Sequence, residues 1–296
     1  MCGRYAASAR PDELVEAFDV EQDHTGEPAR SILKSPQEPP AGTPDWNMAP
    51  SKQAPVVLAR RPRGSTDHAN NAGDANNAGD VNNADNAHPM RQLRLLTWGL
   101  VPAWAKDVKM GMRMTNARAE SVLDKGAFAK AASARRCLVP AEGWYEWQAS
   151  PTATDAKGKP RKQPFFIRRA DGGPVAFAGL YEFWRDRQRP DGDPDAWLTT
   201  FTIITTAADP GMDRIHDRQP LVLERDQWDQ WLDPRETNPR HVQALLDFAE
   251  PGRFVAHPVS TAVGATRNNG AHLLDPLPRS ELVGVIDPMT GEVIGG

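Results

Sequence analysis

Short runs of apolar and β-branched residues recur along the chain and predict strands. Six such runs cover residues 54–59, 93–101, 135–141, 163–169, 175–184 and 198–208. Four other segments predict helices, at residues 11–18, 119–133, 224–232 and 238–249. Because strands outnumber helices and do not alternate strictly with them, the pattern predicts an α+β fold with a mostly antiparallel sheet.

Polar segments interrupt this pattern. Residues 21–45 are rich in Pro and polar residues, and residues 63–90 contain the repeat NNAGDA NNAGDV NNADNA. Both are predicted to be insertions. The second cannot bury enough apolar area to offset its conformational entropy, so we expect a disordered loop. Residues 149–163 and 186–196 are predicted to be loops between strands.

Composition makes the chain a globular protein of one or two domains. It has 296 residues, of which 39% are apolar, and it contains nine Trp, enough for a substantial core. No stretch approaches 18 consecutive apolar residues and no signal peptide is expected. The two cysteines, Cys2 and Cys137, exclude a disulfide framework and indicate a reducing, cytoplasmic location. Cys137 lies in an apolar run and is expected to be an inert core thiol.

Charge is spread unevenly along the chain. Its net charge is −4, but residues 91–140 contain ten Lys or Arg against three Asp or Glu. A local basic face is sufficient to contact phosphates, because such contacts act over short distances at physiological salt. The same charges are equally compatible with a solvated surface, so charge alone leaves nucleic-acid binding open.

Several common motifs are absent. The sequence contains no GxGxxG, Walker loop, HExxH or CxxC pair, so neither a nucleotide cofactor nor a metal is expected.

The opening residues MCGRYA predict a reactive N-terminus. An initiator Met before a small residue is usually removed, which would give Cys2 a free α-amine beside its thiol. These groups titrate near pH 8 and about 8.5, so both reach a nucleophilic form close to neutral pH. The amine forms a Schiff base with an aldehyde, and the thiol then closes a thiazolidine ring. The alternative is a small residue that is merely tolerated after Met.

Three further clusters carry candidate chemistry. In TNARAE, strand alternation would place Asn116, Arg118 and Glu120 on one side of an extended segment, with the Arg suited to phosphate. In PAEGWYEW, Glu142 and Glu146 would share a face, and a carboxylate desolvated by indole rings acquires a raised pKa.

The third cluster, IHDRQP, follows a predicted buried strand. His216 can exchange protons near neutral pH, Asp217 is placed to orient it, and Arg218 is placed to pair with a phosphate. Each of the three clusters also has an ordinary structural interpretation, as a surface loop, a core strand or a structural histidine.

Taken in order, these segments resemble the SOS-response-associated peptidase (SRAP) family, the abasic-site processing proteins. The matching segments are MCGRYA, WNMAP, TWGLVPAW, NARAE, CLVPAEGWYEW, QPFFI, ITTAAD, IHDRQPLVL and HPVSTAVG. The resemblance implies one α+β domain over residues 1–280, with a bifurcated, mostly antiparallel sheet folded into a pseudo-barrel and peripheral helices. Residues 281–296 would then be a C-terminal tail.

The resemblance also implies residue roles. Met1 would be removed, by the protein itself or by an aminopeptidase; Cys2 would be the nucleophile and Asn116 would position its amine. Glu146 would be the acid/base residue, and His216 would assist sugar ring opening and crosslink reversal. The residues implied to contact DNA are Arg4, Asn47, Trp104, Arg118, Thr205 and Arg218. No metal or cofactor is implied.

The implied partner is single-stranded DNA with abasic sites, including junctions with duplex DNA. A duplex hides the reacting C1′, phosphate contacts supply affinity without sequence preference, and aromatic groups replace the missing stacking. The Schiff-base stage also permits weak strand cleavage by β-elimination. We expect a monomer that contacts no membrane, cytoplasmic and associated with the nucleoid when bound to DNA.

Three other functions remain open from the residues. An N-terminal-nucleophile amidohydrolase would use the Cys2 amine as base for its thiol, but leaves Glu146, His216 and the arginines unexplained. A Cys peptidase acting on other proteins would need an oxyanion hole and a peptide groove. A DNA-binding module without catalysis is the third. Trapping of an aldehyde separates them, since only the abasic-site reaction requires both the thiol and the α-amine.

Overall fold

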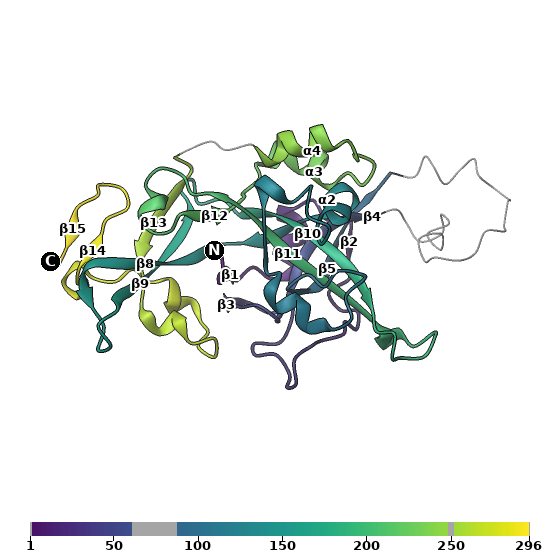
Figure 1. The fold of residues 1–296 in the computed structure, drawn as a ribbon, viewed down its shortest axis with the longest axis horizontal. Coiled ribbons are helices and arrows are strands. Elements are labelled where there is room, and N and C mark those ends of the chain that lie inside the picture. Colours follow the sequence, from purple (N-terminus) through teal and green to yellow (C-terminus); the bar gives the residue numbers. More distant parts are fainter. Residues whose placement is uncertain (1, 61–87, 248–251, 296) are drawn as a thin grey trace.

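Two β-sheets lie side by side along the long axis of the molecule, and one of them closes on itself (Figure 1). The computed structural model describes residues 2–60, 88–247 and 252–295. One sheet has the strand order β13 (Phe254–Pro258), β9 (Pro160–Arg169), β8 (Gly143–Thr154), β1 (Tyr5–Ala7) and β3 (Asp45–Met48). The first strand of the chain therefore lies inside this sheet, and it brings the N-terminal residues to the centre of the fold.

The second sheet has eight strands. Its order is β12 (Arg218–Pro220), β11 (Trp197–Ala207), β10 (Val175–Arg185), β7 (Arg136–Ala141), β4 (Gln53–Arg60), β5 (Met90–Trp98) and β2 (Gln22–Asp23), with β6 (Asn116–Arg118) beside β11. A parallel pairing of β11 with β5, Phe201 opposite Trp98, closes five of these strands into a barrel. The predicted α+β pseudo-barrel is therefore confirmed, with both parallel and antiparallel pairs.

The barrel strands are buried on both faces, which explains their continuous apolar sequences. Inside, alternate residues of each strand form one apolar cluster, which includes Tyr181 and Phe201. Gly179 of β10 is required here, because a Cβ atom would lie 2.9 Å from the Cys137 Sγ atom. Outside the barrel, a second apolar layer packs beneath the helices, and Trp231 and Val242 belong to this layer.

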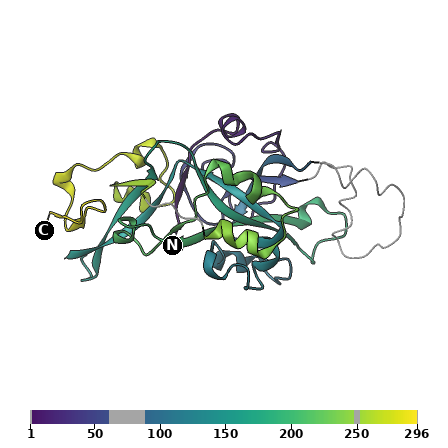
Figure 2. The same cartoon turned by 90° about the horizontal axis from the view of Figure 1, so that it is seen from above.

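The helices are short and peripheral (Figure 2). The α-helices are α1 (Pro11–Ala17), α2 (Ala129–Ala134), α3 (Trp228–Leu232) and α4 (Pro239–Leu246). The 3-10 helices are η2 (Val108–Arg113), η3 (Ala119–Ser121), η4 (Pro194–Ala196), η5 (Met212–Arg214), η6 (Arg225–Gln227), η7 (Thr261–Gly264), η8 (Ala271–Leu274) and η9 (Arg279–Glu281).

All six predicted strands are present, and so are helices near all four predicted positions. The predicted helix 119–133 is only partly helical, since turns separate η3 from α2. The prediction of a loop over 149–163 is wrong for most of its length, because β8 and β9 form a long hairpin joined by residues 155–159. Most of the Asn-rich insertion, residues 61–87, lies outside the described residues.

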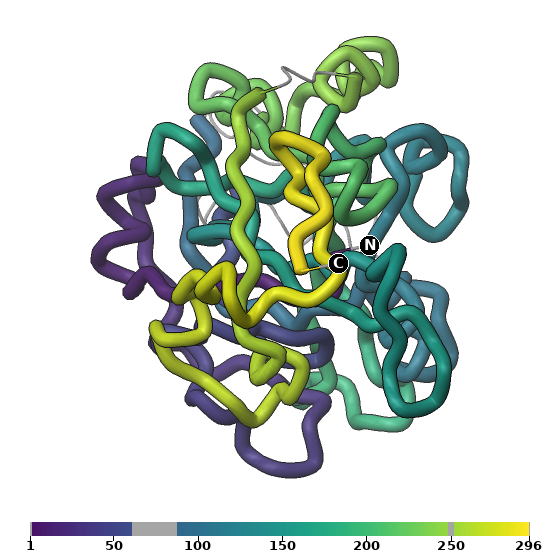
Figure 3. The backbone as a smooth tube through the Cα atoms, turned by 90° about the vertical axis from the view of Figure 1, so that its left-hand side faces the viewer, coloured from purple at the N-terminus to yellow at the C-terminus, as the bar shows by residue number. Residues whose placement is uncertain are grey.

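The expected C-terminal tail is a packed hairpin. Strands β14 (Val285–Ile286) and β15 (Val293–Ile294) pair with each other, and Val285 and Leu282 are buried. The hairpin lies against β8 at one end of the long axis, and Figure 3 views the molecule from that end.

Candidate functional site

Cys2 lies three positions before the start of β1 and is fully buried. Its side chain belongs to the same apolar cluster as Tyr5, Trp98 and Trp144, in which the Tyr5 ring packs edge-on against Trp98. Burial raises the pKa of the Cys2 thiol above its usual range, and the nearby Glu146 carboxylate raises it further. The thiol is therefore protonated at neutral pH and needs a base in order to react.

Asn116, the first residue of β6, contacts this cysteine directly. Its side-chain Nδ2 donates a hydrogen bond of 2.8 Å to the Cys2 carbonyl oxygen. Its Oδ1 atom is buried and accepts no hydrogen bond from the described residues. An unused buried acceptor is costly in a folded protein, so the Asn116 oxygen is available to a donor at Cys2.

Glu146 on β8 is a buried carboxylate with an altered proton affinity. It is only 3% exposed, and burial raises its pKa to about 7. Pairing of β1 with β8, Tyr5 opposite Trp144, places it on the strand next to Cys2. A carboxyl group with this pKa gives and takes protons at neutral pH, as general acid–base catalysis requires. Glu142, predicted to share its face, instead lies exposed, bonded to the Ser8 hydroxyl.

His216 follows η5 in the loop before β12. Burial lowers its pKa, so the ring is neutral at pH 7. In the neutral ring, Nδ1 accepts a hydrogen bond of 3.0 Å from the Arg218 backbone N–H. The Asp217 carboxylate lies 2.9 Å from the same nitrogen and becomes its partner when Nδ1 is protonated. His216 can therefore exchange a proton while keeping a partner in both states.

Arg218 on β12 is held by a carboxylate on η3 and by the backbone of β11. Its guanidinium makes two bonds to the Glu120 carboxylate, of 2.6 and 3.0 Å, and one of 2.6 Å to the Thr205 carbonyl oxygen. The bond from Arg218 lowers the pKa of Glu120. Arg118 and Thr205 are opposite each other on β6 and β11, so the two arginines lie near the same strand end.

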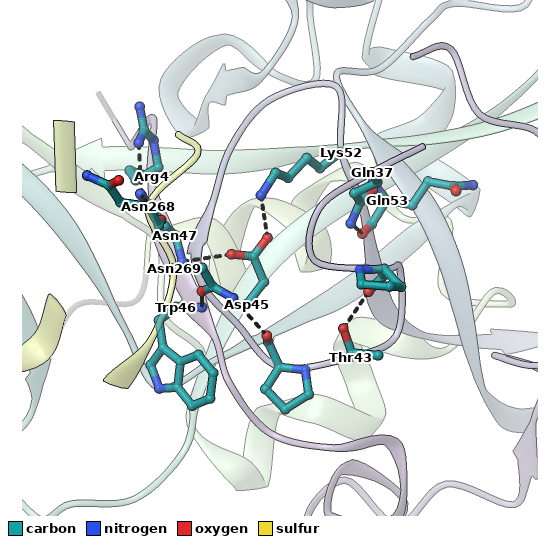
Figure 4. Close-up of polar contacts among 12 residues, drawn as sticks. Arg4, Gln37, Thr43, Asp45, Trp46, Asn47, Lys52, Gln53, Asn268 and Asn269 are labelled. Carbon is teal, nitrogen blue, oxygen red and sulfur yellow. Dashed lines mark hydrogen bonds and ion pairs between the residues drawn. The ribbon is translucent and has the colours of Figure 1, made fainter. Parts of the chain in front are cut away.

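Arg4 is held by Asn47, on β3 (Figure 4). The Arg4 Nη1 donates 2.8 Å bonds to the Asn47 Oδ1 and to the Val263 carbonyl oxygen. Asn47 is fully buried, and its Nδ2 donates to the carbonyl oxygens of Val263, Ala265 and Asn268. The structure thus places Asn47 behind Arg4, where it holds the loop and the arginine rather than facing solvent.

A buried ion pair lies behind this contact. The Lys52 ammonium is 2.7 Å from the Asp45 carboxylate, whose other oxygen accepts the Asn47 backbone N–H. Sequence patterns gave no sign of this pair, because both residues lie in segments that look like ordinary loops.

Comparison with known proteins decides the family. The model of the family described as SOS response associated peptidase (SRAP) matches residues 1–266. The chain belongs to the SRAP family. It is 34% identical over 275 residues to the abasic site processing protein YoaM of Bacillus subtilis, covering 93% of this chain and 98% of that one. It is 27% identical to the abasic site processing protein HMCES of Xenopus tropicalis, covering 91% and 76%.

The fold of this SRAP chain also resembles a solved structure. A crystallised protein from Bacteroides thetaiotaomicron matches with a TM-score of 0.66 at 19% identity, covering 94% of this chain and all of that one. At that identity the match supports the fold alone.

The remaining predicted residues differ in exposure. Thr205 is fully buried, whereas Trp104 is 58% exposed in the loop between β5 and β6. Among the described residues, Trp104 makes no hydrogen bond to another predicted site residue. Cys137 is buried as predicted, and burial raises its pKa.

One polar residue near the site was missed in the SRAP sequence. Gln148 follows Glu146 by two positions on β8, so alternation places both on one face. Its Nε2 donates to the carbonyl oxygens of Arg214, at 3.0 Å, and Ile286, at 2.9 Å. Gln148 thus links the C-terminal hairpin to the segment that precedes His216, and the period-2 pattern would have identified it.

Within residues 2–60, 88–247 and 252–295, no group of three or more His, Cys, Asp or Glu is arranged to hold a metal ion. In the same ranges, every helix is too short or too polar to cross a membrane.

Proposed function

We propose that this protein processes abasic sites in single-stranded DNA by forming a thiazolidine through Cys2. The relatives named abasic site processing proteins support this substrate. The observation that carries the proposal is the contact of Asn116 with Cys2, beside a Glu146 whose pKa is about 7. In the proposed mechanism, Asn116 would position the amine and Glu146 would transfer protons at the same residue.

The proposed reaction requires removal of Met1, by the protein itself or by an aminopeptidase. The Cys2 amine then attacks the aldehyde carbon of the ring-opened sugar and expels its oxygen as water, which leaves a Schiff base. The thiol adds to the imine carbon, and the imine nitrogen takes up one proton. Glu146 supplies the proton for the leaving water and accepts the proton of the thiol.

His216 would assist ring opening and reversal of the crosslink, because its neutral ring and Asp217 allow a proton to move at this position. Arg4, Arg118 and Arg218 would hold phosphates, and exposed Trp104 would stack on a neighbouring base. Asn47 would act through Arg4. Weak strand cleavage would follow from β-elimination at the Schiff base.

The experiment is intact-protein mass after incubation with single-stranded DNA that carries one abasic site. We expect a stable adduct with the wild type and none with Cys2→Ala. Cys2→Ser keeps the amine but lacks the thiol, so its adduct should persist only after borohydride reduction. DNA without the lesion is the control substrate.

A wild type without Met1 that forms no adduct would contradict the proposal. Glutamine hydrolysis by the same preparation, lost in Cys2→Ala, would then favour the amidohydrolase.

A further inference from the structure

The proposed chemistry does not use the end of the barrel away from Cys2, and this end is open. A cavity of about 1780 Å³ opens there, lined by residues of β4, β5, β10 and β11. That volume exceeds the roughly 300–1,000 Å³ of common small-molecule pockets. No residue of the site described above lines it.

Toward this end of the barrel, the inward-facing residues of the strands change from apolar to charged. On β4 the inward positions run Val56, Leu58 and Arg60, as two core residues are followed by an arginine. Arg94 of β5 is paired with Val56 of β4, so the two side chains lie on the same, inward face of the sheet. Arg185 of β10 is paired with Trp197 of β11. Three strands therefore point arginines into one cavity.

These arginines differ in their ion-pair partners. Arg94 lies 3.1 Å from Glu27, and Arg185 pairs with Asp191, whose side chain is fully exposed and can move away. Arg60 pairs with no carboxylate among the described residues; its guanidinium instead lies 5.1 Å from the Phe183 ring centre. Like charges that converge on one space are stabilised by an anion.

Aromatic side chains line the same cavity. Phe183 and Trp197 lie next to the arginines, and Trp197 is 37% exposed. Arginines beside exposed aromatic rings are suited to phosphates joined to flat bases, since the rings stack on bases and the guanidinium groups bind the backbone. A simple polyanion would gain nothing from the rings.

We propose that this open end of the barrel is a second binding site for nucleotides, sized for a short single strand. Phosphates would lie on Arg60, Arg94 and Arg185, and a base would lie against Phe183 or Trp197. The site does not need Cys2, so it goes beyond the proposed chemistry. The same groups would bind a free nucleotide, which the test separates from a strand.

The test measures binding of fluorescent (dT)4 to the full chain in the Cys2→Ala background at about 0.15 M salt. The double variant Arg60→Gln/Arg185→Gln should bind at least about tenfold more weakly. The matched control Arg240→Gln/Arg279→Gln changes two arginines outside the cavity and should stay within about twofold. Melting temperatures show whether the variants fold.

Three further arms complete the test. A tetramer with the same phosphates but no bases should bind about fivefold more weakly, because base stacking is lost. Thymidine monophosphate should compete only weakly; if it competes as well as (dT)4, the ligand is a free nucleotide. With Cys2 restored, the Arg60→Gln/Arg185→Gln variant should still form the abasic-site adduct.

Unchanged (dT)4 binding in Arg60→Gln/Arg185→Gln would overturn the second site, and so would a loss caused only by Arg218→Gln. Equal binding of the tetramer without bases would overturn the role of the aromatic rings. If the wild type forms no abasic-site adduct while (dT)4 binding still depends on Arg60 and Arg185, the proposed chemistry is rejected and the second binding site is still supported.

Discussion

Individual side chains at the site combine catalytic potential with a cost in stability. Glu146 shows this most clearly, because burial in the fold raises the pKa of its carboxyl group to about 7 from an ordinary value of 4.5. Between these pH values the folded protein holds a proton that the unfolded chain releases. Stability must therefore fall as pH rises through this window, by at most about 3 kcal/mol.

Replacement Glu146→Gln should separate the two effects. The neutral amide removes the cost of a buried charge, so the variant should be more stable than wild type at pH 8 and about equal at pH 4.5. Its adduct formation should slow by about 100-fold or more, because the proton-transfer group is gone. Denaturant unfolding at both pH values and single-turnover kinetics measure the two quantities. A variant with unchanged kinetics would remove Glu146 from the mechanism.

Glu120, the ion-pair partner of Arg218, is a second residue whose replacement is informative. Glu120 occupies Arg218 through two bonds and would compete with a phosphate for it. Glu120→Gln should therefore tighten binding of single-stranded DNA about two- to fivefold and steepen its salt dependence, a modest gain because the carboxylate is half exposed. Fluorescence anisotropy at two salt concentrations measures this. Glu281→Gln, an exposed acid elsewhere, is the control; weaker binding by Glu120→Gln would show that Glu120 positions Arg218 instead.

At the scale of elements, strand pairing assembles the site. Asn116 on β6 and Arg218 on β12 lie on opposite sides of β11, whereas Cys2 and Glu146 come from the other sheet. Such pairings join segments as distant in the sequence as Tyr5 and Trp144, and local sequence does not specify them. The C-terminal hairpin adds a clamp: Gln148 bonds Ile286 through both ends of its amide, and Arg214 Nη1 bonds the Pro288 carbonyl oxygen at 2.5 Å.

Deletion of residues 281–296 should therefore loosen the segment that carries His216. Loss of buried Leu282 and Val285, with the Gln148 bonds, should cost about 2–4 kcal/mol and slow adduct reversal more than its formation. Thermal unfolding and the two rates measure this. Gln148→Leu keeps the hairpin and its Arg214–Pro288 bond but removes the bonds that Gln148 makes to Arg214 and Ile286. If both variants reverse adducts at the wild-type rate, the clamp does not position His216.

On the scale of the whole molecule, the first described residue, Cys2, lies in the interior. β1 pairs with both β8 and β3, and Cys2 is fully buried beside it. An uncleaved N-terminal extension should therefore reduce adduct formation to the level of Cys2→Ala, because it blocks the amine at this enclosed position. Mass spectrometry before and after protease removal of the extension measures this. Full activity with the extension in place would show that the α-amine is not used.

Much of this architecture could be predicted from the sequence. The barrel strands could be predicted because both of their faces are buried, which produces continuous apolar runs such as APVVLA and VAFAGLYEFW. The β8–β9 hairpin was missed beyond Ala149 because its outer half is exposed and polar, with no apolar alternation. The contact of Asn116 with Cys2 was expected only from the family resemblance. Buried Asn47 and the Asp45–Lys52 pair could not be predicted, since they depend on loops distant in sequence.

The enclosure of Cys2 also affects how well its thiol resists oxidation before the protein meets a substrate. Peroxides and disulfides attack the thiolate form of exposed cysteines, and a buried thiol with a raised pKa offers neither the charge nor the access. Cys137 is equally shielded. Both thiols should resist oxidation to sulfenic acid under the oxidative conditions that also damage DNA. The chain can then remain reduced through an oxidant burst and still hold its reactive sulfur when an aldehyde is delivered directly to it.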